Sequence, residues 1–272
     1  MKKLKTETGI DCTEYGNNDN KKCFVLNNGI TLDQSHLKQV GDYFANNSSM
    51  KLISYDQPNQ GESDIRTVKN DCDYKLQREA FGDVLNELAK DNNIIHAGGY
   101  SYSGATVMNE TRNNLVSYEV LISPYTDVMS FLPPNLLNVI KMQPKAIADT
   151  ICKLLGMKPV YLNATVELFK GDETYKDISE KNGGDWDNEL RGFELLNCIL
   201  NAPWLGMIKE LKAKYVTVVN AKNDKVISPS STRRFAKMIN ADLIEYDGGH
   251  GDILDLDKTF ATWDQIIKNL EN

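Results

Sequence analysis

The chain has no long apolar run and no extended basic cluster, and each absence excludes a class of protein. No stretch approaches the roughly 18 consecutive apolar residues of a membrane-spanning helix, and the basic start MKKLKTETGIDC is not followed by the apolar segment of a secretory signal peptide. Basic residues gather only in pairs such as Lys2-Lys3 and Arg233-Arg234, and 38 Asp+Glu outnumber 31 Lys+Arg. Phosphate binding needs a concentrated positive surface, so no nucleic-acid partner is expected.

Cysteine is scarce and irregular. The five cysteines form no C-x-x-C or Cys/His pair, so neither a disulfide framework nor a zinc site is expected. Scattered reduced thiols favour a cytoplasmic protein. With 272 residues, 41% hydrophobic and 25% charged, the composition is that of a globular chain with one large domain or two small ones.

Short apolar, β-branched runs alternate with helical patterns, which is typical of βαβ units and a mainly parallel sheet. The predicted strands are Cys23–Leu26, Lys51–Tyr55, Asn93–Ala97, Tyr118–Ile122, Tyr215–Asn220 and Asp242–Tyr246. The predicted helices are Tyr74–Lys90, Pro229–Ile239 and Lys258–Leu270. Ser228 is the expected N-cap of the second helix, and Phe260 and Trp263 share the expected apolar stripe of the third.

The interval 127–212 breaks this alternation, because it contains several prolines and no convincing strand. We interpret it as a mostly helical lid inserted between two parts of one α/β core, residues 1–126 and 213–272. Its apolar residues, among them Phe131, Leu132 and Trp204, are candidates for lining an acyl pocket, although an apolar stripe is more often ordinary core.

The strongest chemical signal follows the third predicted strand, in the sequence Gly98-Gly99-Tyr100-Ser101-Tyr102-Ser103-Gly104. A serine on a sharp strand-to-helix turn needs small residues two positions before and two after it. Around Ser101 these are Gly99 and Ser103. Ser101 is therefore the preferred nucleophile, and Ser103 is the weaker competitor.

A serine needs a histidine to accept its proton and a carboxylate to orient that histidine. Of the three histidines, His96 lies in an apolar strand and is expected in the core, and His36 lies in a polar segment expected to be a surface helix. His250, in the glycine loop after the last strand, is the predicted base.

The predicted acid is Asp224, in the loop after the strand Tyr215–Asn220. The order Ser101, Asp224, His250 leaves room for one helix and one strand between acid and base. Asp127 is the alternative acid, and Asp252 is expected to be a cap or surface residue.

Two backbone amides are candidates for an oxyanion hole. An early strand runs into Asn27-Asn28-Gly29-Ile30, where Gly29 allows close approach of a substrate and the N–H of Ile30 could face a developing oxyanion. The second donor would be the N–H of Tyr102. Asn28 and Gly29 are candidate substrate-binding residues.

Together these segments resemble the α/β-hydrolase superfamily. The resemblance rests on Asn28-Gly29, on the turn Asp56–Ser63 that is similar to D-x-x-G-x-G-x-S, on the elbow at Ser101, and on the loops of Asp224 and His250. It implies a mostly parallel eight-stranded sheet flanked by helices, a Ser101-His250-Asp224 triad, no metal or organic cofactor, and acyl transfer through an acyl-enzyme.

The chain departs from the family where Asn28 replaces a histidine and Ser103 replaces a glycine. The first hypothesis is a serine hydrolase acting on a carboxylic ester or thioester, including one bound to a carrier protein or coenzyme A. The second is an acyltransferase that passes the acyl chain to an alcohol or amine, and the third is a non-catalytic ligand-binding protein on the same fold.

Overall fold

The computed structural model describes residues 1–16, 21–29, 32–58, 61–63, 74–109, 113–125 and 215–272. The strands are β1 (Lys2–Lys5), β2 (Asp11–Tyr15), β3 (Lys22–Asn27), β4 (Lys51–Tyr55), β5 (Ile94–Tyr100), β6 (Val116–Ile122), β7 (Tyr215–Ala221) and β8 (Asp242–Tyr246). The α-helices are α1 (Lys38–Asn47), α2 (Tyr74–Ala89), α3 (Ser103–Asn109), α11 (Pro229–Met238) and α12 (Leu256–Glu271). Short 3-10 helices are η1 (Gln34–Leu37), η2 (Asn113–Leu115) and η6 (Gly251–Leu254).

The described strands form one sheet in the order β1-β2-β4-β3-β5-β6-β7-β8. Strands β1 and β2 are antiparallel to their neighbours, and the pairs from β4 through β8 are parallel. The expected mostly parallel eight-stranded sheet is therefore confirmed. All six strands predicted from the sequence are present, and β1 and β2 are additions that the hydrophobic pattern does not reveal.

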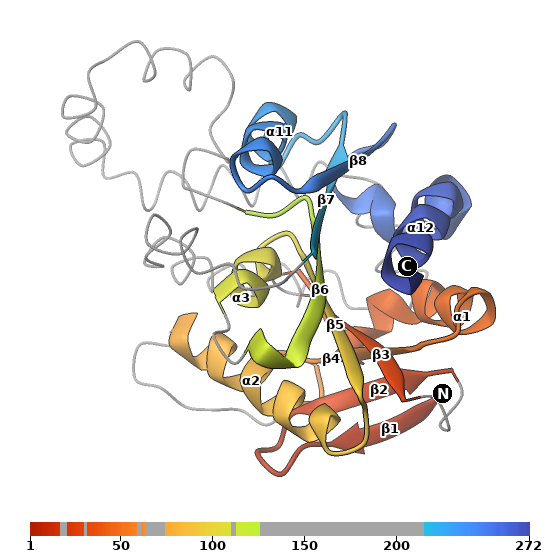
Figure 1. Ribbon diagram of the computed structural model, residues 1–272, viewed down its shortest axis with the longest axis vertical. Coiled ribbons are helices and arrows are strands. Elements are labelled where there is room, and N and C mark those ends of the chain that lie inside the picture. Colours follow the sequence, from red (N-terminus) through yellow and green to blue (C-terminus); the bar gives the residue numbers. More distant parts are fainter. Residues whose placement is uncertain (17–20, 30–31, 59–60, 64–73, 110–112, 126–214) are drawn as a thin grey trace, which may run out of the picture.

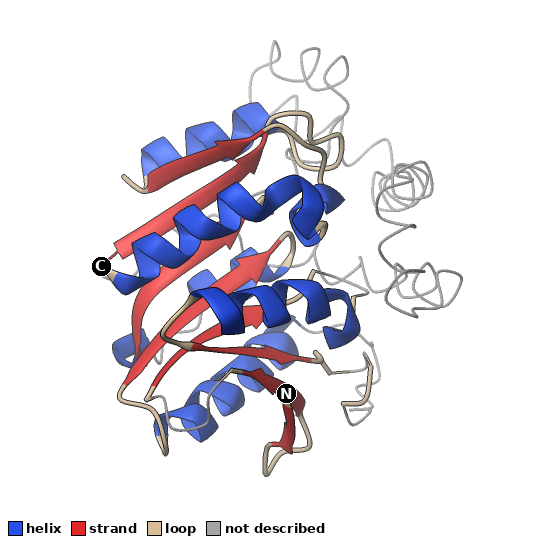
Figure 2. Cartoon of the chain, turned by 90° about the vertical axis from the view of Figure 1, so that its right-hand side faces the viewer, coloured by secondary structure: helices blue, strands red, loops and turns tan. Residues whose placement is uncertain are grey.

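Helices cover both faces of the sheet. Figure 1 shows α1 and α12 on one face and α2, α3 and α11 on the other. The view from the side brings α1 and α12 in front of the twisted strands (Figure 2). Strands β3, β4 and β6 are buried along most of their length, which explains the continuous apolar runs in these parts of the sequence.

Helix α12 shows how the pattern of buried residues follows the helical period. Trp263, Ile266 and Leu270 are buried, and the indole of Trp263 donates to the carbonyl of Ile253 at 2.9 Å. The expectation that Phe260 belongs to this stripe is wrong, because its side chain is 55% exposed. Successive residues of a helix are about 100° apart around its axis, which places Phe260 at the margin of the buried face.

One further local expectation is corrected. His36 lies in η1 and is fully buried, not on a surface helix, and its Nδ1 lies 3.1 Å from the carboxylate of Asp33. Ser228 is the N-cap residue of α11 and Pro229 begins the helix, as expected. The hydroxyl of Ser228 contacts that of Ser230 at 2.9 Å and makes no capping hydrogen bond.

Several expectations fall on residues outside the described ranges. These are the lid 127–212 with Phe131, Leu132 and Trp204, the alternative acid Asp127, and Ile30. In the part of the chain that is described, every helix is too short or too polar to cross a bilayer.

Candidate active site

Ser101 lies at a sharp turn between β5 and α3. Its φ of +56° falls in the left-handed region, which is costly for a residue other than glycine and is typical of functional turns. The surrounding backbone holds it there, because Ser101 N donates to the carbonyl of Ile122 at 2.8 Å and its own carbonyl accepts from Tyr125 N at 3.0 Å. The turn is therefore fixed by the neighbouring strand β6 and the loop that follows it.

Close packing at the elbow requires glycine at two positions. A Cβ on Gly99 would lie 2.4 Å from the carbonyl oxygen of Ser103, and one on Gly104 would lie 2.7 Å from Cβ of Pro124. The second small position of the motif is thus supplied by Gly104. Ser103 therefore carries a side chain at the position where the G-x-S-x-G pattern has its second glycine.

The structure brings together the three residues predicted as nucleophile, base and acid. Nε2 of His250 lies 3.0 Å from Oγ of Ser101, and Nδ1 of His250 lies 2.7 Å from Oδ2 of Asp224. The side chains of His250 and Asp224 are 0% and 1% exposed. A carboxylate only accepts, so Nδ1 carries the proton that is shared with Asp224 and Nε2 faces the serine hydroxyl as an acceptor.

Backbone amides fix the orientation of Asp224. Its Oδ1 accepts from Val226 N at 2.8 Å and from Ile227 N at 2.7 Å, which leaves Oδ2 for His250. Asp224 follows β7, and His250 immediately precedes η6 after β8. Consecutive parallel strands bring their carboxyl ends to one edge of the sheet, which explains why residues far apart in the sequence meet here.

A group of buried amides and hydroxyls holds the loop that follows β3. Nε2 of Gln57 lies 2.9 Å from Oδ1 of Asn27, 2.8 Å from the carbonyl of Asn28 and 2.6 Å from Oγ of Ser103. The hydroxyl of Ser103 also donates to the carbonyl of Asn28. We call Gln57, Ser103 and the Asn28 carbonyl the loop clamp, because they join the segments after β3, β4 and β5.

Ser103 therefore has a hydrogen-bonding role that differs from that of the nucleophile position. Sequence reasoning identified it as a small residue of the elbow and as the weaker competitor of Ser101, but not as a hydrogen-bonding residue. Gln57 was missed, and its place in the turn after β4 was the one available signal. Asn28, expected to bind substrate, is fully buried, and neither polar atom of its side chain has a hydrogen-bond partner among the described residues.

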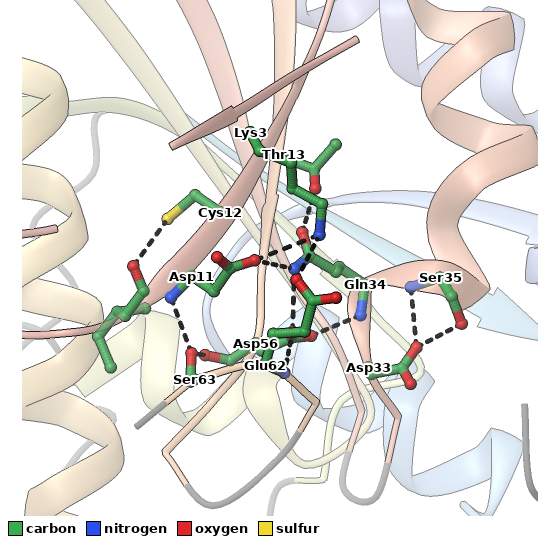
Figure 3. Close-up of polar contacts among 11 residues, drawn as sticks. Lys3, Asp11, Cys12, Thr13, Asp33, Gln34, Ser35, Asp56, Glu62 and Ser63 are labelled. Atoms are coloured by element: carbon green, nitrogen blue, oxygen red, sulfur yellow. Dashed lines mark hydrogen bonds and ion pairs between the residues drawn. The ribbon is translucent and has the colours of Figure 1, made fainter. Parts of the chain in front are cut away.

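A second set of polar contacts joins the turn after β4 to η1, as Figure 3 shows. Asp56 accepts from Gln34 N at 2.7 Å, from Gln34 Nε2 at 2.9 Å and from Glu62 N at 2.8 Å. Ser63 donates to the carbonyl of Asp56 and accepts from Asp11 N. Burial raises the pKa of Asp56 to about 6 despite these donors. Asp56, Glu62 and Ser63 thus have a structural role.

A cavity of about 220 Å³ lies beside this network, away from the triad, and is lined by residues such as Lys3, Asp33, Gln34 and Asp56. The ammonium group of Lys3 donates hydrogen bonds to the carboxylates of Asp11 and Glu62. The carboxylate of Asp33 accepts from the backbone N–H of Ser35 and lies within hydrogen-bond distance of Nδ1 of His36. The described residues include no group of three or more His, Cys, Asp or Glu side chains arranged to hold a metal ion.

Comparison with known proteins places the fold. No protein-family model matches the chain, and no curated protein sequence does. Among solved structures, the thioesterase domain from the curacin biosynthetic pathway is similar with a TM-score of 0.68 at 15% identity, over 98% of each chain. An enol-lactonase from Burkholderia xenovorans LB400 gives 0.68 at 15% identity over 100% of both chains. An esterase from Exiguobacterium antarcticum gives 0.67 at 13% identity over 99% of both. The sheet order, the elbow and these likenesses together show that the chain has the α/β-hydrolase fold.

Proposed function

We propose that this protein is a serine hydrolase that cleaves a carboxylic ester or thioester through an acyl-enzyme on Ser101. The observation that carries the proposal is the unbroken series of contacts from Asp224 through His250 to Ser101. The positive φ of Ser101 supports it, because such strain persists where a side chain must be presented in one orientation. Similar structures that are an esterase, a thioesterase and a lactonase agree with this chemistry.

The proposed reaction has two halves. In the first, Oγ of Ser101 attacks the carbonyl carbon while its proton passes to Nε2 of His250. Collapse of the tetrahedral intermediate breaks the bond to the leaving alcohol or thiol, which takes that proton. In the second half, water gives a proton to His250 and attacks the acyl group, and Ser101 recovers its proton as the acid departs.

The negative oxygen of the intermediate needs fixed donors. We assign this role to the N–H of Tyr102, which lies between the nucleophile and the start of α3, and to the N–H of Ile30, which lies outside the described residues. The loop clamp supports the assignment, because it fixes the peptide group directly before Gly29. The lid, with Phe131, Leu132 and Trp204, remains our proposal for the acyl-binding side.

The test is intact-protein mass spectrometry after exposure to p-nitrophenyl esters and acyl thioesters of graded chain length. Native protein, Ser101→Ala and the matched neighbour Ser103→Ala are compared. The proposal predicts an acyl adduct and p-nitrophenol release in native protein and in Ser103→Ala, but not in Ser101→Ala. Absence of an adduct, of turnover and of fluorophosphonate labelling in native protein would overturn it in favour of a ligand-binding role.

The same experiment separates hydrolysis from acyl transfer. If the adduct decays in water alone, the hydrolase assignment is supported. An adduct that persists in water and is discharged by an added alcohol or amine overturns the hydrolytic step and leaves an acyltransferase with the same triad.

A further inference from the structure

Tyr100 is the last residue of β5 and lies directly before the nucleophile. It is 1% exposed and pairs with Ile122 of β6. Side chains alternate along a strand, so Tyr100 shares a face with Gly98 and His96. That face also holds Phe24, which lies opposite His96 in the sheet register. The ring of Phe24 stacks on Phe44 of α1. Tyr100 therefore points to the face of the sheet that α1 covers. Figure 1 shows α12 on the same face, and α12 is joined to η6 by the hydrogen bond from Trp263 to the carbonyl of Ile253.

Three contacts of Tyr100 join separate parts of the site. Its hydroxyl donates to the backbone carbonyl of His250 at 2.9 Å. Its ring lies 5.1 Å from the imidazole of His250, centroid to centroid, with the planes tilted by 31°. On the loop after β3, a Cβ on Gly29 would be only 3.0 Å from Cδ1 of Tyr100, so the glycine backbone packs directly against the ring.

We propose that Tyr100 is a positioning residue for His250, holding the imidazole in line with Ser101 and stabilising its protonated form during the reaction. The inference rests on the proposed function. It has two separable parts. The hydroxyl fixes the main chain at the histidine itself, and the ring provides a π surface beside the imidazole.

The ring part follows from the chemistry of the reaction. His250 becomes a cation when it accepts the proton of Ser101, and a cation within about 6 Å of an aromatic centroid is attracted by the ring. Removing the ring therefore disfavours the imidazolium relative to the imidazole. The acidic limb of a pH–rate profile, where His250 must be neutral to act, then moves to lower pH.

Other charged groups near the histidine stay in place in this comparison. Asp224 faces Nδ1 from the loop after β7. On η6, Asp252 accepts from Gly249 N at 2.6 Å and from Lys258 of α12 at 2.9 Å. Neither Tyr100→Phe nor Tyr100→Leu removes these groups, so a shift of the limb reports the ring itself.

The experiment measures the rate of fluorophosphonate labelling from pH 5 to pH 9 in native protein, Tyr100→Phe, Tyr100→Leu, Tyr15→Leu and Ser101→Ala, normalised to the labelled end point. Tyr15 is a matched control, because it is a buried tyrosine of the same sheet, packed against Gly41 of α1. We expect Tyr100→Phe to slow labelling by about two- to tenfold, the range of one ordinary hydrogen bond, with an unchanged midpoint. Tyr100→Leu should also lower the midpoint by about half a pH unit.

A purely structural role predicts a different result. Tyr100→Leu and Tyr15→Leu would then both lower the melting temperature, and both would keep the native midpoint and normalised rate, which would overturn the inference. If Tyr100→Leu does not fold, Tyr100→Phe still tests the role of the hydroxyl, because it keeps the ring. Labelling of Tyr100→Phe at the native rate would overturn the proposed role of the hydroxyl. Native protein that fails to label, or Ser101→Ala that labels equally, would contradict the proposed function instead.

Discussion

Nδ1 of His250 and Oδ2 of Asp224 lie 2.7 Å apart, and the other oxygen of Asp224 is held by two backbone N–H groups. The acid thus has one oxygen committed to its own loop and one to the histidine. Because the two backbone N–H groups of the loop can only donate hydrogen bonds, this arrangement determines how the site responds when the carboxylate of Asp224 is replaced by an amide.

Asp224→Asn should reduce kcat by up to about 10⁴, with little loss of folding. The amide oxygen must accept from Val226 N and Ile227 N, so the NH₂ group of the asparagine faces His250. Nδ1 of His250 must then accept a hydrogen bond, which places the imidazole proton on Nε2. A protonated Nε2 can no longer accept the proton of Ser101. Esterase kinetics with a p-nitrophenyl ester measure this. Asp247→Asn is the matched control, because its carboxylate is 82% exposed and should leave kcat unchanged. Equal rates for both variants would exclude Asp224 as the acid.

The loop clamp predicts a second kinetic effect. Gln57→Leu keeps the approximate shape of the side chain but removes the donor shared by Asn27, Asn28 and Ser103. We expect kcat to fall by about tenfold or more with KM nearly constant, because the clamp supports groups that act in the transition state.

Ser103→Ala should be milder than Gln57→Leu, because Gln57 still holds the Asn28 carbonyl. Steady-state kinetics on both variants check the order. If Ser103→Ala abolishes turnover and Ser101→Ala does not, Ser103 is the nucleophile and the elbow assignment is wrong.

Gly99→Ala should destabilise the protein by about 1–3 kcal/mol or more, because the added Cβ would meet a backbone oxygen at 2.4 Å. Gly249→Ala is the comparison, since its Cβ would meet its nearest atom, Oδ2 of Asp252, at 3.6 Å. Urea unfolding of the two variants distinguishes them. A Gly99→Ala variant as stable as Gly249→Ala would show that the elbow can relax.

Glu119 predicts a pH dependence of stability. It is 1% exposed on β6, and neither carboxylate oxygen has a partner among the described residues. Burial raises its pKa from 4.5 to about 8. The folded chain therefore binds more protons than the unfolded chain across this window, and the free energy of unfolding falls as pH rises, by at most about 1.4 kcal/mol per pH unit from this group.

In the window from pH 6.5 to 8 the effect of Glu119 dominates. Burial lowers the pKa of His96 to about 4, so His96 adds an opposite dependence that fades within about one pH unit above its ordinary value of 6.5, and His96→Gln removes this contribution. The pKa of Asp56 is raised to about 6, so this group changes the free energy of unfolding mainly below that pH. Urea midpoints at pH 6.5, 7.2 and 8 should fall in native protein and in His96→Gln, and should stay flatter in Glu119→Gln. Identical slopes in all three would contradict the prediction.

The inner parallel strands, β3 to β7, could be predicted because they are buried along most of their length. Strand β4 has the predicted bounds, and β5 extends past the predicted end at Ala97 to Tyr100. Glycine is a weak strand former, so Gly98-Gly99 looked like the end of the strand. In the structure Gly98 continues the strand and packs against the ring of Phe24. A Cβ on Gly98 would lie 2.5 Å from this ring.

The N-terminal strands could not be predicted from hydrophobicity. Strand β1 is a largely exposed edge with three lysines. Strand β2 is buried but polar, and its Glu14 forms an ion pair with the buried Lys51 at 3.3 Å. Such pairing depends on the register between distant strands, which a local pattern does not contain.

The candidate site was more predictable than the contacts that support it. Ser101, Asp224 and His250 each stand in a loop with its own local signal of small or polar residues. Tyr100 and Gln57 lie in the same kinds of segment, but nothing local marks them out, because their importance comes from partners 150 and 46 residues away. His36 was misplaced for the same reason, since Asp33 and the surrounding core bury a segment that looks polar.

The pairing of β6 with β7 also bears on the order of events during folding. Tyr118 lies opposite Tyr215, so this pairing closes a loop of 215 − 118 = 97 residues, whereas the contact of β5 with β6 closes a much shorter one. Closing a longer loop costs more chain entropy before any contact repays it. The half of the molecule that carries Ser101 can therefore organise before the half that carries Asp224 and His250 docks onto it. Recovery of serine reactivity after dilution from denaturant should then lag behind recovery of secondary structure, which makes reactivity a reporter of the last long-range step.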